Sequence, residues 1–352
     1  MNKITLAGKT YGYWNPYIIA EIGVNHEGKL DLAKRMIDEA AAAGVHGVKF
    51  QTYKADKIAS KEHSKYYWDL KEEPSTSQHQ LFQKYDAFER AEYEALAKHA
   101  KAAKVDFLST PFDLDAVDML DDLVPFFKIA SADITNIPML KKIASKNKPI
   151  ILSTGASTLS EIQEALDTLR ANGAKEICLL HCILNYPTPE DHAHLGVIKT
   201  LTKTFPDCTI GYSDHVKPNT NGDMPALMLA SFEGSVVLEK HFTFDKTLPG
   251  NDHYHAMDHK DLKKFCEQLK QYRTLYGTEE KNLDNEKRAR TNARRRICTS
   301  TEIPAGTTIT ESMLIPLRAD IGINVSFWEE VIGKKTLQTF KPGQPVEWSQ
   351  LG

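Results

Sequence analysis

Several features that mark particular classes of protein are missing from this 352-residue chain. No apolar run approaches the ~18 residues that a membrane-crossing helix needs. The N-terminal residues 1–5 are not followed by the apolar segment of a secretory signal. The 44 basic and 47 acidic side chains leave a net charge of −3, so nothing electrostatic favours nucleic acid or an anionic membrane.

Cysteine is also scarce. The five cysteines are odd in number and scattered along the chain, which indicates neither a disulfide framework nor a zinc knuckle. Hydrophobic residues make up 41% of the sequence, enough to bury a sizeable core. We therefore expect a cytoplasmic protein with no membrane or nucleic-acid partner.

Short apolar runs recur along the first three quarters of the chain, and helical periodicity follows each of them. They predict eight strands, at residues 17–20, 47–50, 106–109, 126–129, 149–152, 177–180, 208–211 and 236–239. Helices are predicted at residues 30–43, 89–103 and 260–276, and Thr158 with Glu161 has the pattern of a capping box. The connection at residues 53–88 is unusually long, as is typical of a lid.

This alternation predicts an α/β fold, a (β/α)8 or TIM barrel over residues 1–278. A doubly wound sheet is the alternative, but residues 23–28, GVNHEG, lack the three-glycine spacing of its first turn. Residues 279–296 are highly charged and predict a solvated linker. Residues 297–352 are rich in strand and turn patterns and predict a small separate β-rich module.

Polar side chains stand at the carboxyl end of every predicted barrel strand, which is where such barrels carry their active sites. They include Glu21, Lys49, Gln51, Thr110, Lys128, Ser131, Asp133, Tyr186, Ser213, His215, Glu239 and His241. Burying that many unpaired polar groups at one rim costs several kcal/mol without partners. The pattern favours a site, with a structural ion-pair network as the alternative.

Two lysines from different strands, Lys49 and Lys128, would repel each other in one barrel mouth unless an anion bound between them. The hydroxyls of Thr110, Ser131 and Ser213 would complete a cradle of phosphate size. Taken alone, each lysine could equally be a surface group. Together they predict a phosphorylated substrate.

Two histidines, His215 and His241, follow the neighbouring seventh and eighth strands, and such a pair suits a divalent transition metal. Glu21 is expected to complete or orient that site. His253 and His255 also have metal-like spacing, but they lie in a loop that we interpret as a cover for the barrel mouth. From the same loop, Asp252 can reach a substrate hydroxyl.

The stretch IGYSDHVKP, residues 210–218, places serine, aspartate and histidine side by side. Neighbouring residues of a strand point to opposite faces, so these three cannot form a catalytic triad among themselves. Ser213 and His215 share one face, where we expect phosphate and metal. Asp214 points away and is expected to anchor a loop or a neighbouring strand.

The motifs AEIGVNHEG, VKFQTYKADKI, FLSTPFD, KIAS, LSTGAS, YPTP, GYSDH and EKHFTFDKTLPGND occur in this order along almost the whole chain. They resemble the sialic acid synthase family, whose members condense phosphoenolpyruvate with an N-acetylated hexosamine to make nonulosonic acids. The last 55 residues or so resemble that family's antifreeze-like (SAF) domain. The resemblance implies a domain-swapped homodimer in which each SAF domain covers the barrel of its partner.

The same resemblance implies roles for individual residues. Lys49, Thr110, Lys128, Ser131 and Ser213 match phosphoenolpyruvate-binding positions. His215 and His241 match ligands of a divalent metal, usually manganese, with magnesium or cobalt as alternatives. Glu21, Gln51, Tyr186 and Asp252 match positions near the metal or sugar, and Arg318 matches an arginine that reaches the partner's sugar. We expect the metal to polarise the sugar aldehyde and Glu21 to orient or deprotonate a water.

Three departures leave the identity of the sugar open. Asp133 stands where many relatives have glutamate, Leu184 stands in place of an asparagine with Asn185 one position late, and residues 317–320 read LRAD. The candidates are N-acetylmannosamine, its phosphate, or a diacetamido-trideoxyhexose for legionaminic or pseudaminic acid. Another metal-dependent aldolase and a non-catalytic sugar-binding barrel are the remaining alternatives.

Overall fold

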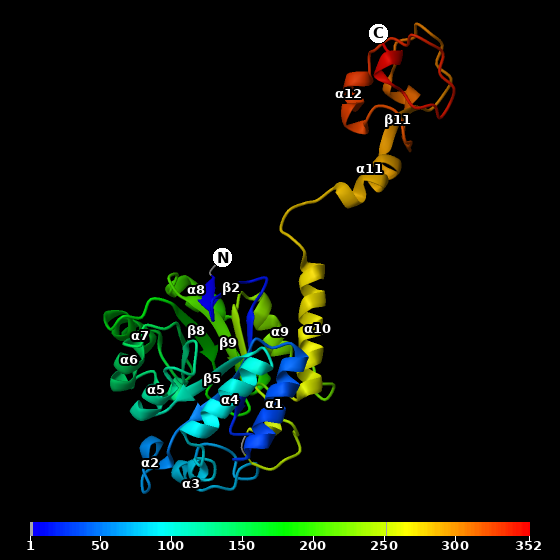
Figure 1. Cartoon of the computed structure of the whole chain (residues 1–352). Coiled ribbons are helices and arrows are strands. Elements are labelled where there is room, and N and C mark those ends of the chain that lie inside the picture. Colours follow the sequence, from blue (N-terminus) through cyan, green and yellow to red (C-terminus); the bar gives the residue numbers. More distant parts are fainter. Residues whose placement is uncertain (1–2, 251) are drawn as a thin grey trace. The chain divides into compact units, whose positions relative to one another are not determined.

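The computed structural model describes residues 3–250 and 252–352. Met1, Asn2 and Asn251, the first residue of the loop predicted to cover the barrel mouth, lie outside the described residues. The chain divides into two compact units, Met1–Tyr276 and Gly277–Gly352, which are described separately (Figure 1). Among the described helices, none combines the length and the apolar character needed to cross a bilayer.

The first unit is built on one sheet of eight parallel strands in the order β5-β4-β3-β10-β9-β8-β7-β6, and its end strands β5 and β6 also lie against each other. These strands are β3 (Tyr17–Gly23), β4 (Gly47–Thr52), β5 (Asp106–Pro111), β6 (Phe127–Ile129), β7 (Ile150–Ser153), β8 (Ile177–Cys182), β9 (Thr209–Asp214) and β10 (Val237–His241). The predicted (β/α)8 barrel is confirmed. Most strands run a few residues past their predicted ends, so the polar side chains lie within the barrel wall.

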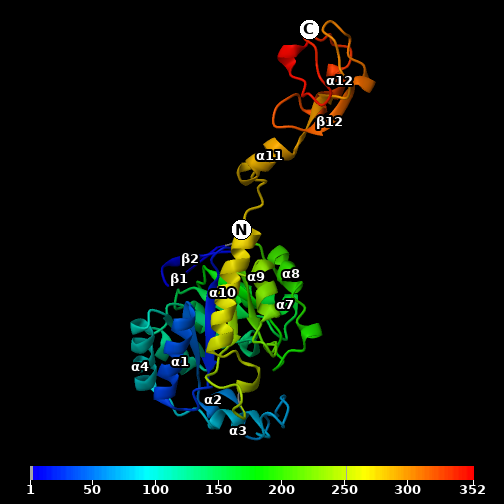
Figure 2. The ribbon, with the colours of Figure 1, turned by 90° about the vertical axis from the view of Figure 1, so that its right-hand side faces the viewer.

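Helices surround this barrel (Figures 1 and 2). They are α1 (Leu30–Ala43), α4 (Arg90–Ala102), α5 (Leu114–Leu120), α6 (Ile137–Ala144), α7 (Leu159–Ala171), α8 (Val197–Thr204), α9 (Pro225–Phe232) and α10 (His259–Tyr276). Gly44 ends α1 in the left-handed conformation, with φ of 100°, which glycine adopts without steric cost. The predicted capping box is present, because Thr158 and Glu161 each accept a backbone N–H of the other.

An N-terminal hairpin, which the sequence analysis did not predict, pairs β1 (Ile4–Leu6) with β2 (Lys9–Tyr11). Leu6 and Tyr11 pack in one buried cluster with Tyr17 at the start of the barrel strands. In both views the hairpin lies at the end of the barrel opposite α2 (Ala55–Ile58) and α3 (Gln78–Gln83) (Figures 1 and 2). It therefore closes the amino end and leaves the carboxyl end for a site.

The long connection at residues 53–88 contains α2 and α3 and is ordered by polar contacts. Ser77 caps α3 by accepting the N–H of Gln80. The buried carboxylate of Glu73 pairs with Lys84 at 2.6 Å, and Gly250 donates its N–H to the carbonyl of Glu72. The connection is thereby attached to the loop that follows β10.

The second unit has a small antiparallel sheet of β11 (Arg295–Thr299) and β12 (Leu314–Arg318), preceded by α11 (Lys287–Ala293) and followed by α12 (Trp328–Val331). Ile297, Ile303, Ile309, Phe340 and Val346 form part of its own core. The seven residues of α11 lie within the predicted linker at residues 279–296, so part of this linker is helical. The short 3-10 helices of the protein are η1 (Ser131–Asp133), η2 (Glu190–His192), η3 (His253–His255), η4 (Asp284–Glu286), η5 (Glu311–Met313), η6 (Val325–Phe327) and η7 (Trp348–Gln350).

Candidate active site

A cavity of about 310 Å³ lies at the carboxyl ends of the barrel strands, within the size range of small-molecule sites. Its lining contains every site residue that the sequence predicted in the first unit: Glu21, Lys49, Gln51, Thr110, Lys128, Ser131, Asp133, Tyr186, Ser213, His215, His241 and Asp252. The remaining predicted residue, Arg318, is an exposed residue of β12 in the second unit.

Four charged side chains that line this cavity are almost fully buried: Glu21, Lys49, Lys128 and Glu239. Lys49 Nζ lies 2.6 Å from Glu21 Oε2 and 3.7 Å from Glu239 Oε1. Lys128 Nζ lies 3.7 Å from the same oxygen of Glu239. The carboxylate of Glu239 therefore lies between the two lysines and offsets part of the repulsion that a bound anion was expected to relieve.

The surroundings shift the pKa of each of these groups. Burial raises the pKa of Glu21 even though Lys49 opposes the shift. Burial alone would raise the pKa of Glu239, but Lys128 and Lys49 lower it. Burial would lower the pKa of Lys49, yet Glu21 and Glu239 raise it, whereas for Lys128 burial prevails and its pKa is lowered. Lys128 is thus the less compensated cation and the better placed to receive an anion.

Three hydroxyls surround the lysines. Thr110 Oγ1 accepts a hydrogen bond from Lys49 at 3.1 Å, and Ser213 donates to Glu239 Oε1 at 3.0 Å. Ser131, at the start of η1, accepts the backbone N–H of Gly155 at 2.9 Å. A hydroxyl whose oxygen accepts from the protein keeps its own proton for a ligand. Thr110 and Ser131 are therefore able to donate to phosphate or carboxylate oxygens, whereas the proton of Ser213 is already donated to Glu239.

The two predicted metal ligands lie at the ends of β9 and β10. The ring centroids of His215 and His241 are 5.4 Å apart, and Tyr186 packs against His215 with a centroid distance of 4.1 Å. His215 Nδ1 lies 2.7 Å from the carbonyl of Ile183, which can only accept. Nδ1 therefore carries the proton, and Nε2 keeps a lone pair for a metal.

Glu21, which the sequence analysis expected to complete or orient this site, is the strand partner of His241. Its two carboxylate oxygens contact Lys49 and the amide of Gln51, the latter at 3.2 Å. The side chain that completes the imidazole pair is Asp252, which lies 3.2 Å from His241 Nδ1. Donor atoms of His241, Asp252 and His255 all lie within 4.8 Å of one another.

The pKa shifts of His215, His255 and Asp252 favour the forms that bind a metal. Burial would lower the pKa of His241, but Asp252 raises it. Burial lowers the pKa of His215 well below its ordinary value and lowers that of His255 to about 4, so both rings are neutral near pH 7. Burial would raise the pKa of Asp252, but His241 holds it well below the usual range. Neutral imidazoles and an ionised carboxylate are the forms that bind divalent cations.

The part of the cavity wall that residues 53–88 contribute is largely aromatic, unlike the charged part described above. Its lining includes Tyr53, Tyr67, Trp68, Phe82 and Tyr85. Asp133 faces the same cavity, where burial raises its pKa, and its carboxylate accepts from Asn136 Nδ2 at 3.0 Å. Leu184 lines the cavity, and Asn185 is not among the lining residues.

The expected orientations of Ser213, Asp214 and His215 are confirmed. Ser213 and His215 both line the cavity, whereas Asp214 pairs with the buried Lys240 at 2.9 Å. Asp214 also accepts the hydroxyl of Tyr212 and the N–H of Val216. It anchors β9 to β10 and takes no part in the cavity.

Two residues of the site received no role from the sequence. Glu239 was recognised only as a polar strand end, although its place two residues before His241 puts both on the same face of β10. His255 was interpreted as part of a covering loop. It is instead fully buried and its ring centroid is 5.0 Å from that of His241. No local pattern distinguishes it from His253.

Comparisons with known proteins agree with this geometry. The NeuB family model matches residues 36–281, and the SAF domain model matches residues 294–352. The N,N′-diacetyllegionaminic acid synthase of Campylobacter jejuni is 41% identical over 334 residues, which cover 94% of this chain and 98% of that protein. The enzyme of the same name from Legionella pneumophila is 35% identical over 342 residues, or 95% of this chain and 94% of that one.

A solved structure is similar as well. The N-acetylneuraminic acid synthetase of Leptospira borgpetersenii, crystallised with citrate, aligns with a TM-score of 0.71 at 33% identity. The alignment covers 82% of this chain and 95% of that one. From the family match over most of the barrel and these full-length relatives, we conclude that this chain belongs to the NeuB family and carries a C-terminal SAF domain.

Proposed function

We propose that this protein condenses phosphoenolpyruvate with an N-acetylated amino sugar to give a nonulosonic acid and inorganic phosphate. The observation that carries the proposal is the meeting, in one cavity, of a buried lysine and hydroxyl set with a buried imidazole and carboxylate set. The first set suits a small polyanion, and the second suits a cation that binds an aldehyde oxygen. Membership of the NeuB family supports the same reaction.

In this reaction Lys49 and Lys128 hold the charged groups of phosphoenolpyruvate, and Thr110 and Ser131 donate to its oxygens. Ser213 joins them when its hydroxyl turns from Glu239 to the substrate. Its C3 then attacks the aldehyde carbon of the open-chain sugar, held at contact distance by the cavity. Water adds at the resulting cationic C2, and the tetrahedral intermediate expels phosphate. Glu21 accepts the proton of that water, since a buried carboxylate with a raised pKa is a suitable base near neutral pH.

His215, His241 and Asp252 are the residues suited to a divalent cation, for which we propose manganese, with magnesium or cobalt as alternatives. The lone pair that Ile183 leaves on His215 Nε2 and the ionised Asp252 support this assignment. When bound, such a cation polarises the sugar aldehyde and offsets charge on the new alkoxide. Gln51, Asp133 and Tyr186 are placed to contact the sugar.

For the sugar itself we propose a diacetamido-trideoxyhexose, giving a legionaminic-type product. Lys49 and Lys128 are the only lysine or arginine side chains among the described residues that line the cavity, so a phosphorylated sugar would lack its own counter-charge. The aromatic wall offers apolar surface to the methyl groups of two acetamido substituents and a 6-deoxy carbon. Two of the similar proteins are named for the legionaminic product.

We also propose a cytoplasmic homodimer in which Arg318 of one subunit reaches the sugar bound by its partner. The exposed position of Arg318 on β12 supports this role. All five cysteines are free thiols, as expected in a reducing compartment.

One panel tests the reaction and the sugar together. Purified protein is given phosphoenolpyruvate with N-acetylmannosamine, its 6-phosphate or the diacetamido-trideoxyhexose, and phosphate release and product mass are measured. We expect the highest kcat/KM with the diacetamido sugar. Product formation in a parallel reaction with pyruvate in place of phosphoenolpyruvate would identify an aldolase, and no turnover with any sugar would contradict an enzymatic role.

A further inference from the structure

We propose that His255 is a metal ligand, so that the divalent cation is held by His241, Asp252 and His255 in addition to His215. This inference deepens the proposed function, because it concerns the cation that would serve that reaction. It assigns His255 to coordination rather than to the covering loop, and it predicts three imidazoles around the ion.

The distances among the donor atoms of His241, Asp252 and His255 are compatible with a single bound ion. Metal–nitrogen and metal–oxygen bonds near 2.0–2.2 Å put two neighbouring ligand atoms of one ion about 2.8–4.3 Å apart. Donor atoms of His241, Asp252 and His255 already lie within 4.8 Å of one another. A small inward movement of the side chains is enough to bring all three onto one ion.

The spacing of the three imidazole rings is also compatible with a single bound ion. Ring centroids are 5.0 Å apart for His241 and His255, 5.4 Å for His215 and His241, and 6.3 Å for His215 and His255. Three imidazoles on one ion, bound at about 2.0–2.1 Å, have centroids roughly 4.5–6 Å apart. Two of the three pairs fall in this range and the third is slightly wider.

One ring nitrogen of His255 is buried without a hydrogen-bond partner among the described residues, which favours a role as a ligand. The ring is fully buried; Nε2 lies 3.1 Å from Asp252 Oδ1, and Nδ1 has no hydrogen-bond partner among the described residues. A buried polar atom without a partner costs about 1–3 kcal/mol. Coordination through Nδ1 would remove that cost and leave Nε2 to donate to Asp252. His253, two residues earlier, is equally buried and its Nε2 also has no hydrogen-bond partner among the described residues, but that atom lies 3.7 Å from Glu27. Its Nδ1 is 2.7 Å from the hydroxyl of Thr243, and only His255 shares a donor cluster with His241 and Asp252.

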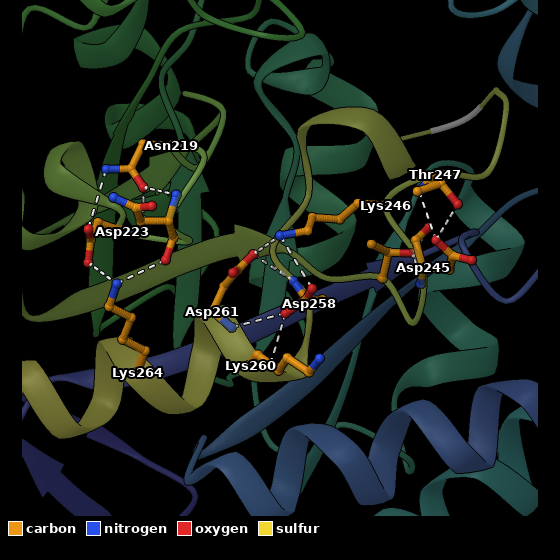
Figure 3. Close-up of polar contacts among 11 residues, drawn as sticks. Asn219, Asp223, Asp245, Lys246, Thr247, Asp258, Lys260, Asp261 and Lys264 are labelled. Atoms are coloured by element: carbon orange, nitrogen blue, oxygen red, sulfur yellow. Dashed lines mark hydrogen bonds and ion pairs between the residues drawn. The ribbon is translucent and has the colours of Figure 1, made fainter.

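The backbone holds His255 in this place. After β10 the chain leaves the barrel and returns, because Met257 donates its N–H to the carbonyl of His241 and Thr243 donates to that of Met257. Lys246 pairs with Asp261 at 2.6 Å and with Asp258 at 3.3 Å, so the base of the excursion is fixed to the start of α10 (Figure 3).

Further contacts brace the two flanks of this excursion. Asp258 accepts the N–H groups of Lys260 and Asp261, and Asp245 accepts the N–H of Thr247 (Figure 3). On the neighbouring loop Asp223 pairs with Lys264 of α10 at 2.6 Å. These contacts brace the loop that carries Asp252 and His255. A metal site requires such bracing, since its ligands must be held in place before the ion binds.

Metal binding without substrate tests the proposal. The full-length protein is freed of metal by chelation and dialysis, and Mn²⁺ is titrated by calorimetry into the wild type, His255→Asn and the matched control His253→Asn. In parallel, pulsed electron paramagnetic resonance of Mn²⁺ bound to the wild type, labelled with ¹⁵N-histidine, counts the coordinated imidazoles. This second measurement does not depend on whether a variant folds.

We expect His255→Asn to raise the Kd for Mn²⁺ about 10–100-fold, with His253→Asn unchanged, and the wild type to show three imidazoles. An unchanged Kd in His255→Asn, or a count of two imidazoles, would overturn the proposal. A higher KM for the sugar with unchanged Mn²⁺ affinity would also overturn it, showing that His255 only positions Asp252. Failure of the proposed reaction would appear instead as a lack of turnover by a protein that still binds Mn²⁺ through three imidazoles.

Discussion

The ammonium nitrogen of Lys49 lies 2.6 Å from a carboxylate oxygen of Glu21, and both side chains are almost completely buried. Such a pair contributes little net stability compared with apolar residues, but removing one partner leaves a buried group uncompensated. The pair therefore links the stability of the barrel to the chemistry of its cavity.

Lys49→Met separates these two roles. We expect the free energy of unfolding to fall by about 3–5 kcal/mol, because Glu21 loses its partner, and the KM for phosphoenolpyruvate to rise at least tenfold, or about 1.4 kcal/mol. The double variant Lys49→Met/Glu21→Gln should recover stability but not substrate affinity. Urea unfolding and steady-state kinetics measure both quantities.

An exposed lysine serves as the control for that experiment. Lys29 pairs with Glu27 at 3.2 Å, and 68% of its side chain is exposed. Lys29→Met is expected to change the free energy of unfolding by less than about 1 kcal/mol and to leave kinetics unchanged. Equal effects of the two substitutions would contradict a special role for the buried pair.

The lowered pKa of Lys128 predicts a pH dependence. Burial favours the neutral amine, so this lysine loses its proton at a lower pH than an exposed lysine does. Because only the ammonium form attracts phosphoenolpyruvate, kcat/KM for that substrate should fall as the pH rises through this pKa. In Lys128→Arg the alkaline fall should move to higher pH, since guanidinium stays protonated. If kcat/KM for phosphoenolpyruvate falls at the same alkaline pH in the wild type and in Lys128→Arg, Lys128 is not the titrating group.

Asp133 provides a test of sugar recognition. Asp133→Asn removes a charged acceptor, and a hydrogen bond to a charged group is worth about 1.5–3 kcal/mol, so kcat/KM for the sugar should fall roughly 10–100-fold. The KM for phosphoenolpyruvate should not change. Asp167→Asn, on the exposed face of α7, is the control. Loss of phosphoenolpyruvate affinity in Asp133→Asn would place this residue with the other substrate.

The proposed contribution of Arg318 to the partner's cavity can be tested by mixing inactive subunits. Arg318→Ala has an intact barrel, and His241→Ala has an intact SAF domain. Refolded together, they should recover roughly a quarter of wild-type activity, since half of the dimers are mixed and one of their two sites is complete. Separately refolded samples, combined afterwards, are the control. No recovery would argue that each chain completes its own site.

Much of the barrel could be predicted from the sequence because its signals are local. All eight strands begin within a residue of their predicted starts, and the limits of α1 agree with the prediction. The hairpin of β1 and β2 was missed since its strands have three residues each, too few to show a period. The helices α2 and α3 were missed for the same reason, being short and embedded in a polar connection.

The sequence by itself determined which side chains share the cavity. Parallel strands bring their carboxyl ends to one rim, and alternation along each strand selects the residues that face inward. The sequence alone therefore predicts that Ser213 faces the cavity and that Asp214 faces away from it. Only the tertiary structure decided which of those side chains meet. Glu239 lies between lysines of two other strands, and His255 reaches His241 because the chain returns at Met257. Such contacts depend on distances across the barrel, which no local pattern encodes.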